Sequence, residues 1–196
     1  MNNEQQSRRA FLKASGSLVG SSWLAFHSPL ILAVSQEAVK ARDSGAAFET
    51  LTAAQAAELD AISAQIIPTD DTPGAREAGV IYFIDGALGS FGGGMKEAVI
   101  AGLDDLHRRV QSQRGEAALF SGLTAPQQIE MLRTVEDTPF FALLRYLTVA
   151  GMFSLPSYGG NRDKIGWQLV GFDNRHHWQP PFGWYDAQLT KGDGNA

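Results

Sequence analysis

The histidines are the residues whose type comes closest to metal chemistry, and the chain has only four of them. Two of them, His176 and His177, are adjacent. Neighbouring side chains of an extended segment point in opposite directions, and no carboxylate or thiol is placed to complete a site. His107 lies among the charged residues of a predicted helix. The pattern predicts no metal site, and the histidines are interpreted as facing solvent or a partner.

A glycine-rich segment matches a phosphate-binding loop in part of its spacing. Gly89 and Gly94 have the four-residue gap of such a loop, but Met95 comes before Lys96, and Glu97 stands where a Ser or Thr would bind Mg²⁺. A phosphate loop also follows a strand, whereas a helical pattern leads into this segment. No G-x-G-x-x-G sequence opens a strand-to-helix turn. The sequence therefore predicts no nucleotide, flavin or nicotinamide site in this chain.

The absence of cysteine restricts nucleophilic and redox chemistry. Without cysteine the chain has no disulfide, thiolate metal site, iron–sulfur ligand or covalently attached haem. Serine, histidine and aspartate are present, but no G-x-S-x-G turn presents a serine as a hydrolase nucleophile. No residue is assigned a catalytic, cofactor-binding or metal-binding role. A free-standing periplasmic enzyme, such as a hydrolase, stays open as the alternative.

Charge separates the first 35 residues from the rest of the chain. The 196 residues have a formal net charge of −5. Residues 1–35 carry Arg8, Arg9 and Lys13 against Glu4, a surplus of +2, which leaves −7 on the remainder. An acidic body disfavours nucleic acid and anionic lipid as partners. The roughly 160 remaining residues suit one domain with a hydrophobic core.

The N-terminal segment has the pattern of an export signal, because its basic start is followed by a weakly apolar run without charge up to Glu37. The start resembles the twin-arginine signal with which bacteria export folded proteins. The residues that carry this resemblance are Ser7, Arg8, Arg9, Phe11, Leu12 and Lys13. Ala33-Val34-Ser35 has the small-residue pattern of a cleavage site.

A retained membrane anchor is the alternative for this segment, but its glycines and Pro29 make a poor membrane span. We therefore divide the chain into a signal segment over residues 1–35, a linker over 36–47 and one domain over 48–196.

Two sequence patterns predict helix starts within the domain. Thr52 with Gln55, and Thr124 with Gln127, have the spacing of capping boxes, in which the threonine and glutamine side chains each bond the other residue's backbone amide. Pro68 ends the first of these helices.

Apolar spacing predicts further helices over residues 75–88 and 95–110, with the glycines of 86–94 forming a flexible loop between them. Pro139 interrupts the chain before residues 140–153, which are apolar on nearly all sides. This last helix is expected to be central to the fold, covered by another protein, or both. Together the patterns predict an all-α bundle of about five helices.

Residues 154–196 lose the helical period and are interpreted as an ordered, irregular tail rich in Gly, Pro and aromatic residues. Asn161 and Asp163 have side chains that bond nearby amides, and Arg162 offers a planar group with five donors. Two interpretations stay open, since these residues either hold the tail on the bundle or hold a partner. The residues assigned to partner binding are Tyr158, Asn161, Arg162, Asp163, Trp178 and Trp184.

Three stretches together resemble a known family. They are the twin-arginine start, "LTAAQAAELDAISAQIIPTDDTPGAREAGVIYFID" at 51–85 and "FFALLRYLTVAGMFSLPSYGGNRDKIGWQLVGF" at 140–172. The Ile-Ile-Pro helix end, the Gly-Ala-Arg-Glu-Ala-Gly turn and the Tyr-Gly-Gly-Asn-Arg-Asp loop are specific when found together. On these residues the chain resembles the gluconate 2-dehydrogenase subunit 3 family. Leu155 departs from the family pattern, and so does the sequence beyond Phe172.

The resemblance implies a noncatalytic small subunit of a membrane-associated sugar, sugar-acid or polyol dehydrogenase. The large subunit would be a flavoprotein of the glucose-methanol-choline type with bound FAD, often joined by a multihaem cytochrome c that carries haem c. The complex is expected in the periplasm, at the outer face of the cytoplasmic membrane. The large subunit has no export signal in such complexes, so it would fold around its flavin in the cytoplasm and leave bound to this chain, which acts as its export escort.

Overall fold

The computed structural model describes residues 47–175, 177, 179 and 182–183, and the regular structure of this part is entirely helical. The all-α prediction is therefore confirmed. Residues 1–46, which include the predicted signal segment, lie outside the described residues, as do Trp178 and Trp184. The described helices are α3 (Ala53–Ile66), α4 (Val80–Gly89), α5 (Gly93–Arg114), α6 (Ala125–Arg133), α7 (Pro139–Phe153) and α8 (Ile165–Leu169), with the 3₁₀ turns η1 (Phe120–Gly122), η2 (Pro156–Tyr158) and η3 (Arg162–Lys164).

Both predicted capping boxes are present. At the start of α3, Thr52 N donates to Gln55 Oε1 at 3.0 Å, and Gln55 N donates to Thr52 Oγ1 at 3.2 Å. At the start of α6, Thr124 N donates to Gln127 Oε1 at 3.0 Å. Each box satisfies amides that have no partner within the first turn of a helix. These two helices therefore begin where the local sequence predicts.

Two predicted boundaries are corrected by the structure. Residues 75–79 form turns, so α4 begins only at Val80, after Gly79 in the left-handed conformation with φ 67°. The glycines of 86–94 do not all form a loop, because Gly86 lies inside α4 and Gly93 begins α5. A run of glycines weakens a helix by only about 1 kcal/mol per residue, which tertiary packing can offset.

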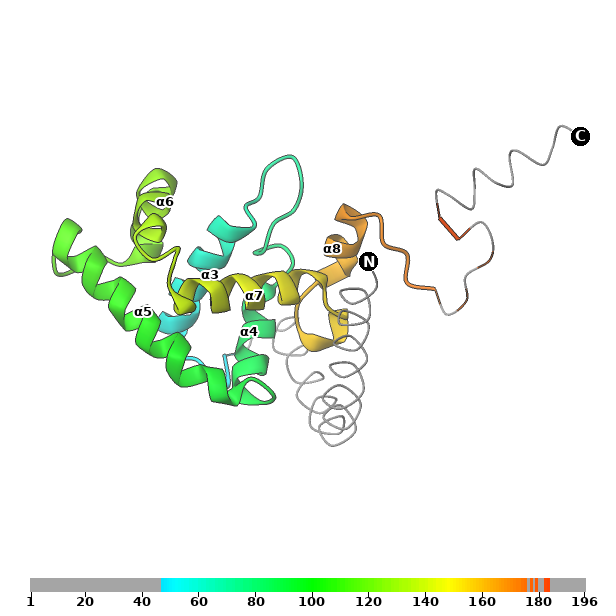
Figure 1. Ribbon diagram of the computed structural model, residues 1–196, viewed down its shortest axis with the longest axis horizontal. Helices are drawn as coiled ribbons and strands as arrows, with labels where there is room; N and C mark the ends of the chain where they lie inside the picture. The colour runs from blue at the N-terminus through cyan, green and yellow to red at the C-terminus, as the bar shows by residue number, and fades with distance from the viewer. Residues whose placement is uncertain (1–46, 176, 178, 180–181, 184–196) are drawn as a thin grey trace, which may run out of the picture.

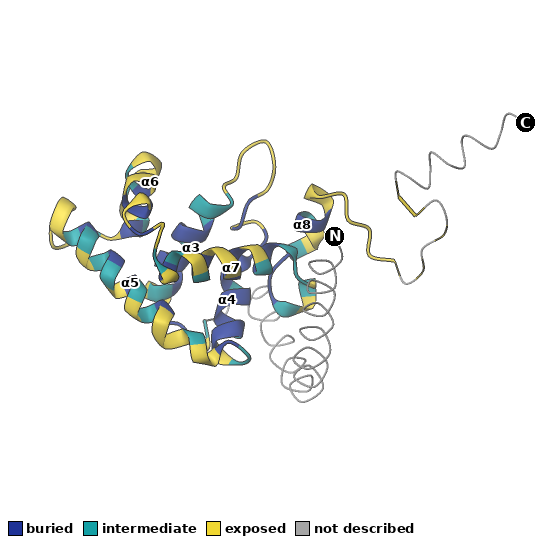
Figure 2. Cartoon of the chain, viewed as in Figure 1, coloured by how far each residue is buried: buried dark blue, intermediate teal, exposed yellow. Residues whose placement is uncertain are grey.

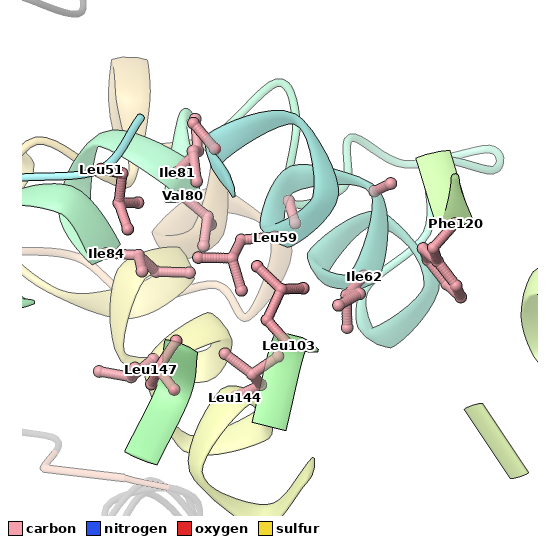
Figure 3. Packing of buried hydrophobic residues seen from close by; sticks show 14 of the residues in the cluster. Leu51, Leu59, Ile62, Val80, Ile81, Ile84, Leu103, Phe120, Leu144 and Leu147 are labelled. Carbon is pink, nitrogen blue, oxygen red and sulfur yellow. The ribbon is translucent and has the colours of Figure 1, made fainter. Parts of the chain in front are cut away.

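Helix α4 lies at the centre of the bundle and contacts α3, α5 and α7. Most of its residues are buried, including both Val80 and Ile84. Figure 3 shows side chains from α3, α5 and α7 pointing into a shared interior, and Leu59, Leu103 and Leu144 are among them. The centre of the core is therefore built by α3, α4, α5 and α7, and Phe120 of η1 with Met131 and Leu132 of α6 extends it.

The helices make an elongated body with α6 at one end and α8 at the other (Figure 1). Helix α7 runs along this body, since it contacts α3, α4 and α5 and then α8. Pro139 is its first residue, and Thr138 Oγ1 accepts a hydrogen bond from Phe141 N at 3.3 Å. The proline that interrupts the preceding chain thus starts this helix, in agreement with the preference of proline for the first helical position.

The length and the apolar character of the described helices decide whether any of them could span a membrane. Within residues 47–175 and the described positions that follow, no helix combines the length and the apolar character needed to cross a bilayer.

Candidate partner-binding surface

Helix α7 has one face in the core and one face in solvent. Leu144 and Leu147 are buried against the other helices. Tyr146 and Val149, three residues apart, are 61% and 44% exposed. Phe153 follows four residues later on the same side of the helix and is partly buried. The expectation that this helix is central to the fold is confirmed, because it contacts α3, α4 and α5. Its cover by another protein stays a prediction, for which the exposed apolar stripe is the candidate surface.

A shallow apolar groove lies where α7 meets α8. Its lining consists of Phe153, Trp167, Val170 and Phe172, and its volume is about 320 Å³. Trp167 forms its floor, since only 6% of this residue is exposed and Nε1 donates to Phe153 O at 2.8 Å. Phe172 packs edge-on against Trp167 with ring centroids 5.3 Å apart. The groove offers apolar surface and no titratable side chain among the residues that line it.

The stripe and the groove are continuous, because Phe153 belongs to both. We call this region the α7–α8 surface and define it by six residues: Tyr146, Val149, Phe153, Trp167, Val170 and Phe172. Figure 2 shows exposed residues along the viewed side of α7 and around α8. A contiguous apolar surface of this kind marks a site of interaction, whereas single exposed apolar residues are normal.

The loop after α7 is tied to the bundle by buried hydrogen bonds. Asn161 is fully buried, donates from Nδ2 to Ser154 O at 2.8 Å and accepts at Oδ1 from Gly166 N at 2.9 Å. Arg162 N donates to Ala78 O at 3.0 Å. Of the two interpretations of this loop, the internal one therefore describes Asn161 and the Arg162 backbone.

Two glycines allow this loop to lie directly on the end of α7. A Cβ atom at Gly160 would lie 2.1 Å from Gly151 O, and one at Gly166 would lie 2.0 Å from Met152 O. Both contacts are with backbone, which cannot rotate away. The close approach places α8 against α7, so it also creates the groove between them.

The turn at residues 74–79 meets the same loop through Ala78. Glu77 Oε2 accepts from Thr69 Oγ1 at 2.7 Å and from Gly74 N at 2.9 Å. The Thr69 hydroxyl is the main reason that the pKa of Glu77 is lowered, since it bonds the charged form. The turn and the loop that carry the family resemblance are thus one packed unit in the structure, although more than 80 residues separate them.

The predicted partner-binding residues have different positions. Tyr158 is partly buried and packs against the core, Arg162 is half-buried and Asp163 is exposed. Asn161 is corrected, because a buried side chain with two internal hydrogen bonds is not available to a partner. Trp178 and Trp184 lie outside the described residues, so their assignment stays a prediction.

Sequence reasoning missed Val170, and it named Phe172 without placing it at a groove. The five residues of α8 are too few to show a helical period, so the turn of helix that holds the groove gives no signal of its own. Apolar residues in a segment rich in glycine and aromatic residues were the one available hint.

Two buried carboxylates have structural partners. Asp85 accepts from the backbone amides of Glu49, Thr50 and Leu51 at 2.8–3.0 Å, and so holds the start of the domain on α4. Glu58 on α3 accepts from the amides of residues 120 and 121, each at 3.0 Å, and so holds η1. Amide bonds compensate the burial of each charge.

Metal-ligating side chains are not gathered at one place in the described part of the chain. No three His, Asp or Glu residues form a group there that fits a metal ion. His107 Nε2 lies 2.8 Å from Gln111 Nε2 one turn along α5, and His177 is exposed. His176 is outside the described residues.

A helical domain with a continuous exposed apolar surface and internally bonded buried carboxylates has the features of a protein-binding module. The particular family follows from comparison with known proteins. The family model described as gluconate 2-dehydrogenase subunit 3 matches residues 53–173, and the chain belongs to this family. No match was found among curated proteins or among solved structures. The family description accordingly identifies the chain as an accessory type of subunit in a multi-subunit dehydrogenase.

Proposed function

We propose that this chain is the small, noncatalytic subunit of a periplasmic flavin-dependent dehydrogenase and that it escorts the large subunit during export. The family match over residues 53–173 is the observation that carries this proposal. The exposed α7–α8 surface supports it, since a subunit that binds another protein needs such a surface. Within the proposal, FAD belongs to a large subunit of the glucose-methanol-choline type, and haem c belongs to a cytochrome subunit.

The export role follows from the N-terminal sequence together with the partner. The pattern from Ser7 to Lys13 resembles a signal that is read on folded cargo. A flavoprotein must fold around its cofactor before it crosses the membrane by this route. A small subunit that carries the signal and binds the folded flavoprotein would allow the flavoprotein to fold first and then be exported. Membrane association would come through the complex.

The test is co-purification of the large subunit. The full chain carries an affinity tag and is purified from the organism that produces it, so that its natural partner is present. We expect a yellow complex that oxidises a sugar, sugar acid or polyol. A tagged chain that is recovered from the periplasm alone and turns over a substrate without flavin would contradict the proposal and favour the free-standing enzyme.

A further inference from the structure

We propose that the α7–α8 surface docks an apolar segment of the large subunit that is flanked by Asp and Glu side chains. This inference rests on the proposed function and adds the location and chemistry of the contact. The apolar character of the docked segment is inferred from the six residues that define the surface. Its acidic flanks are inferred from the distribution of acidic and basic residues along the described chain.

The apolar part is contiguous and lies at one end of the body. Val149 is 44% exposed, Val170 60% and Phe172 50%. They extend from the side of α7 into the groove whose floor is Trp167. Ile129 is also 44% exposed, but it belongs to α6 at the opposite end of the body (Figure 1) and is not among the residues that line this groove. An aromatic floor with exposed aliphatic edges fits the central part of a protein interface.

Charge differs between the first part of the described chain and the last part, which contains α7 and α8. Residues 47–140 contain fourteen acidic and six basic residues, whereas residues 141–175 contain two acidic and four basic residues. Arg145, next to Tyr146 on α7, is exposed, and so is Lys164 immediately before α8. Neither is in an ion pair within the part that the structure describes. Exposed cations at Arg145 on α7 and at Lys164 before α8 attract carboxylates to this part of the surface.

A partner segment that fits this surface therefore has apolar side chains at its centre and carboxylates at its edges. An anionic membrane is the other class of partner with both features. The acidic excess of residues 47–140 would repel such a membrane over most of the domain. The observations thus favour the protein partner.

The experiment uses the full tagged chain co-expressed with the large flavoprotein subunit, and flavin absorbance per tagged chain measures retention. Val149→Asp with Val170→Asp tests the apolar part, because both residues are exposed and neither is in the core. We expect affinity to fall about tenfold or more. Ile129→Asp, at the same exposure as Val149, is the matched control and retains the flavoprotein. Circular dichroism checks that each variant is helical.

A second pair of variants tests the charged part and needs no change in the apolar surface. Arg145→Glu with Lys164→Glu should slow association and reduce its dependence on salt. Lys96→Glu with Arg133→Glu reverses two exposed cations elsewhere and is the control. If the Arg145→Glu, Lys164→Glu variant binds the large subunit as fast as this control does, and with the same salt dependence, the inference of acidic flanks is wrong.

The outcomes separate this inference from the proposed function. If the wild-type chain retains no flavoprotein, both fail. If the wild-type chain retains it and Val149→Asp with Val170→Asp retains it as well as Ile129→Asp does, only the docking surface is wrong. Vesicles of phosphatidylglycerol and phosphatidylethanolamine test the membrane. If the wild-type chain sediments with these vesicles, and the surface variants abolish this sedimentation without changing flavoprotein retention, the proposal of a protein partner is wrong.

Discussion

At the residue scale, buried polar side chains connect parts of the chain that are distant in sequence. Asp85 bonds three amides at residues 49–51, and Asn161 bonds backbone atoms of Ser154 and Gly166. Each of these side chains replaces water at backbone groups that would otherwise be buried without a partner. Their loss should therefore affect stability more than the loss of exposed charges.

Asp85→Asn is predicted to lower the free energy of unfolding by about 2 kcal/mol. The amide group removes the negative charge and replaces one acceptor oxygen with a donor that faces the amides of residues 49–51. Urea unfolding followed by circular dichroism measures the change. Asp104→Asn is the control, because Asp104 is exposed on α5 and has no hydrogen bond or ion pair in the described structure. Equal stability of the two variants would contradict this role of Asp85.

Arg8→Lys with Arg9→Lys is predicted to leave dehydrogenase activity in the cytoplasm. Lysine keeps the positive charge but lacks the planar guanidinium group by which an export receptor would recognise the pair. Activity is measured in separated periplasmic and cytoplasmic fractions, with the wild-type chain as control. Normal periplasmic activity of the double variant would show that this chain does not direct export.

At the element scale, α7 is the helix on which the proposed function depends. It contributes Leu144 and Leu147 to the core and Tyr146 and Val149 to the exposed stripe. Its last turn carries the backbone oxygens that Gly160 and Gly166 approach. The position of α8, and with it the shape of the groove, is therefore set by small residues as much as by the aromatic ones.

Gly160→Ala is predicted to destabilise the domain by about 2–3 kcal/mol, since the new methyl group would lie 2.1 Å from Gly151 O. Gly94→Ala is the matched control, because it has nothing within 4 Å and lies in an exposed turn of α5. The control should be neutral or more stable by up to about 1 kcal/mol. Thermal and urea unfolding distinguish the two, and similar stabilities would show that the loop has room to move.

At the scale of the whole molecule, acidic residues outnumber basic ones over residues 47–140, basic residues outnumber acidic ones over residues 141–175, and the α7–α8 surface belongs to the second of these parts. Residues 170–175 follow α8 and leave the body at the end where α8 lies (Figure 1). Two predictions concern the complex as a whole.

Trp178→Ala and Trp184→Ala are predicted to weaken association with the large subunit about tenfold or more, while the small subunit stays helical. Trp167→Ala is the contrasting variant and should damage the fold, because it removes a buried ring and the hydrogen bond to Phe153 O. Co-purification and circular dichroism are measured together. Full retention of the partner by both tail variants through dilution and salt washes would exclude the tail from the interface.

Alanine at His107, His176 or His177 is predicted to leave turnover per assembled complex unchanged, because no chemical role is assigned to this chain. Yield of the complex is measured separately, so that an assembly defect is not mistaken for a catalytic one. A large fall in turnover with normal assembly would indicate a catalytic contribution from the small subunit.

The sequence by itself determined the helical class, the starts of α3 and α6, and the family. These features depend on residues three or four apart, or on motifs that can be compared directly, so no tertiary contact is needed to recognise them. The export signal is also local, and it stays a prediction from sequence.

Only the tertiary structure decided the interior role of Asn161, the partners of Asp85 and the existence of the groove. Each of these features joins residues from separate elements, and the bond between Arg162 N and Ala78 O spans more than 80 residues. The same asparagine or aspartate in a loop can face solvent, a partner or the core. Its environment follows from how the helices pack, because burial is a property of the assembled fold and local spacing carries no record of it.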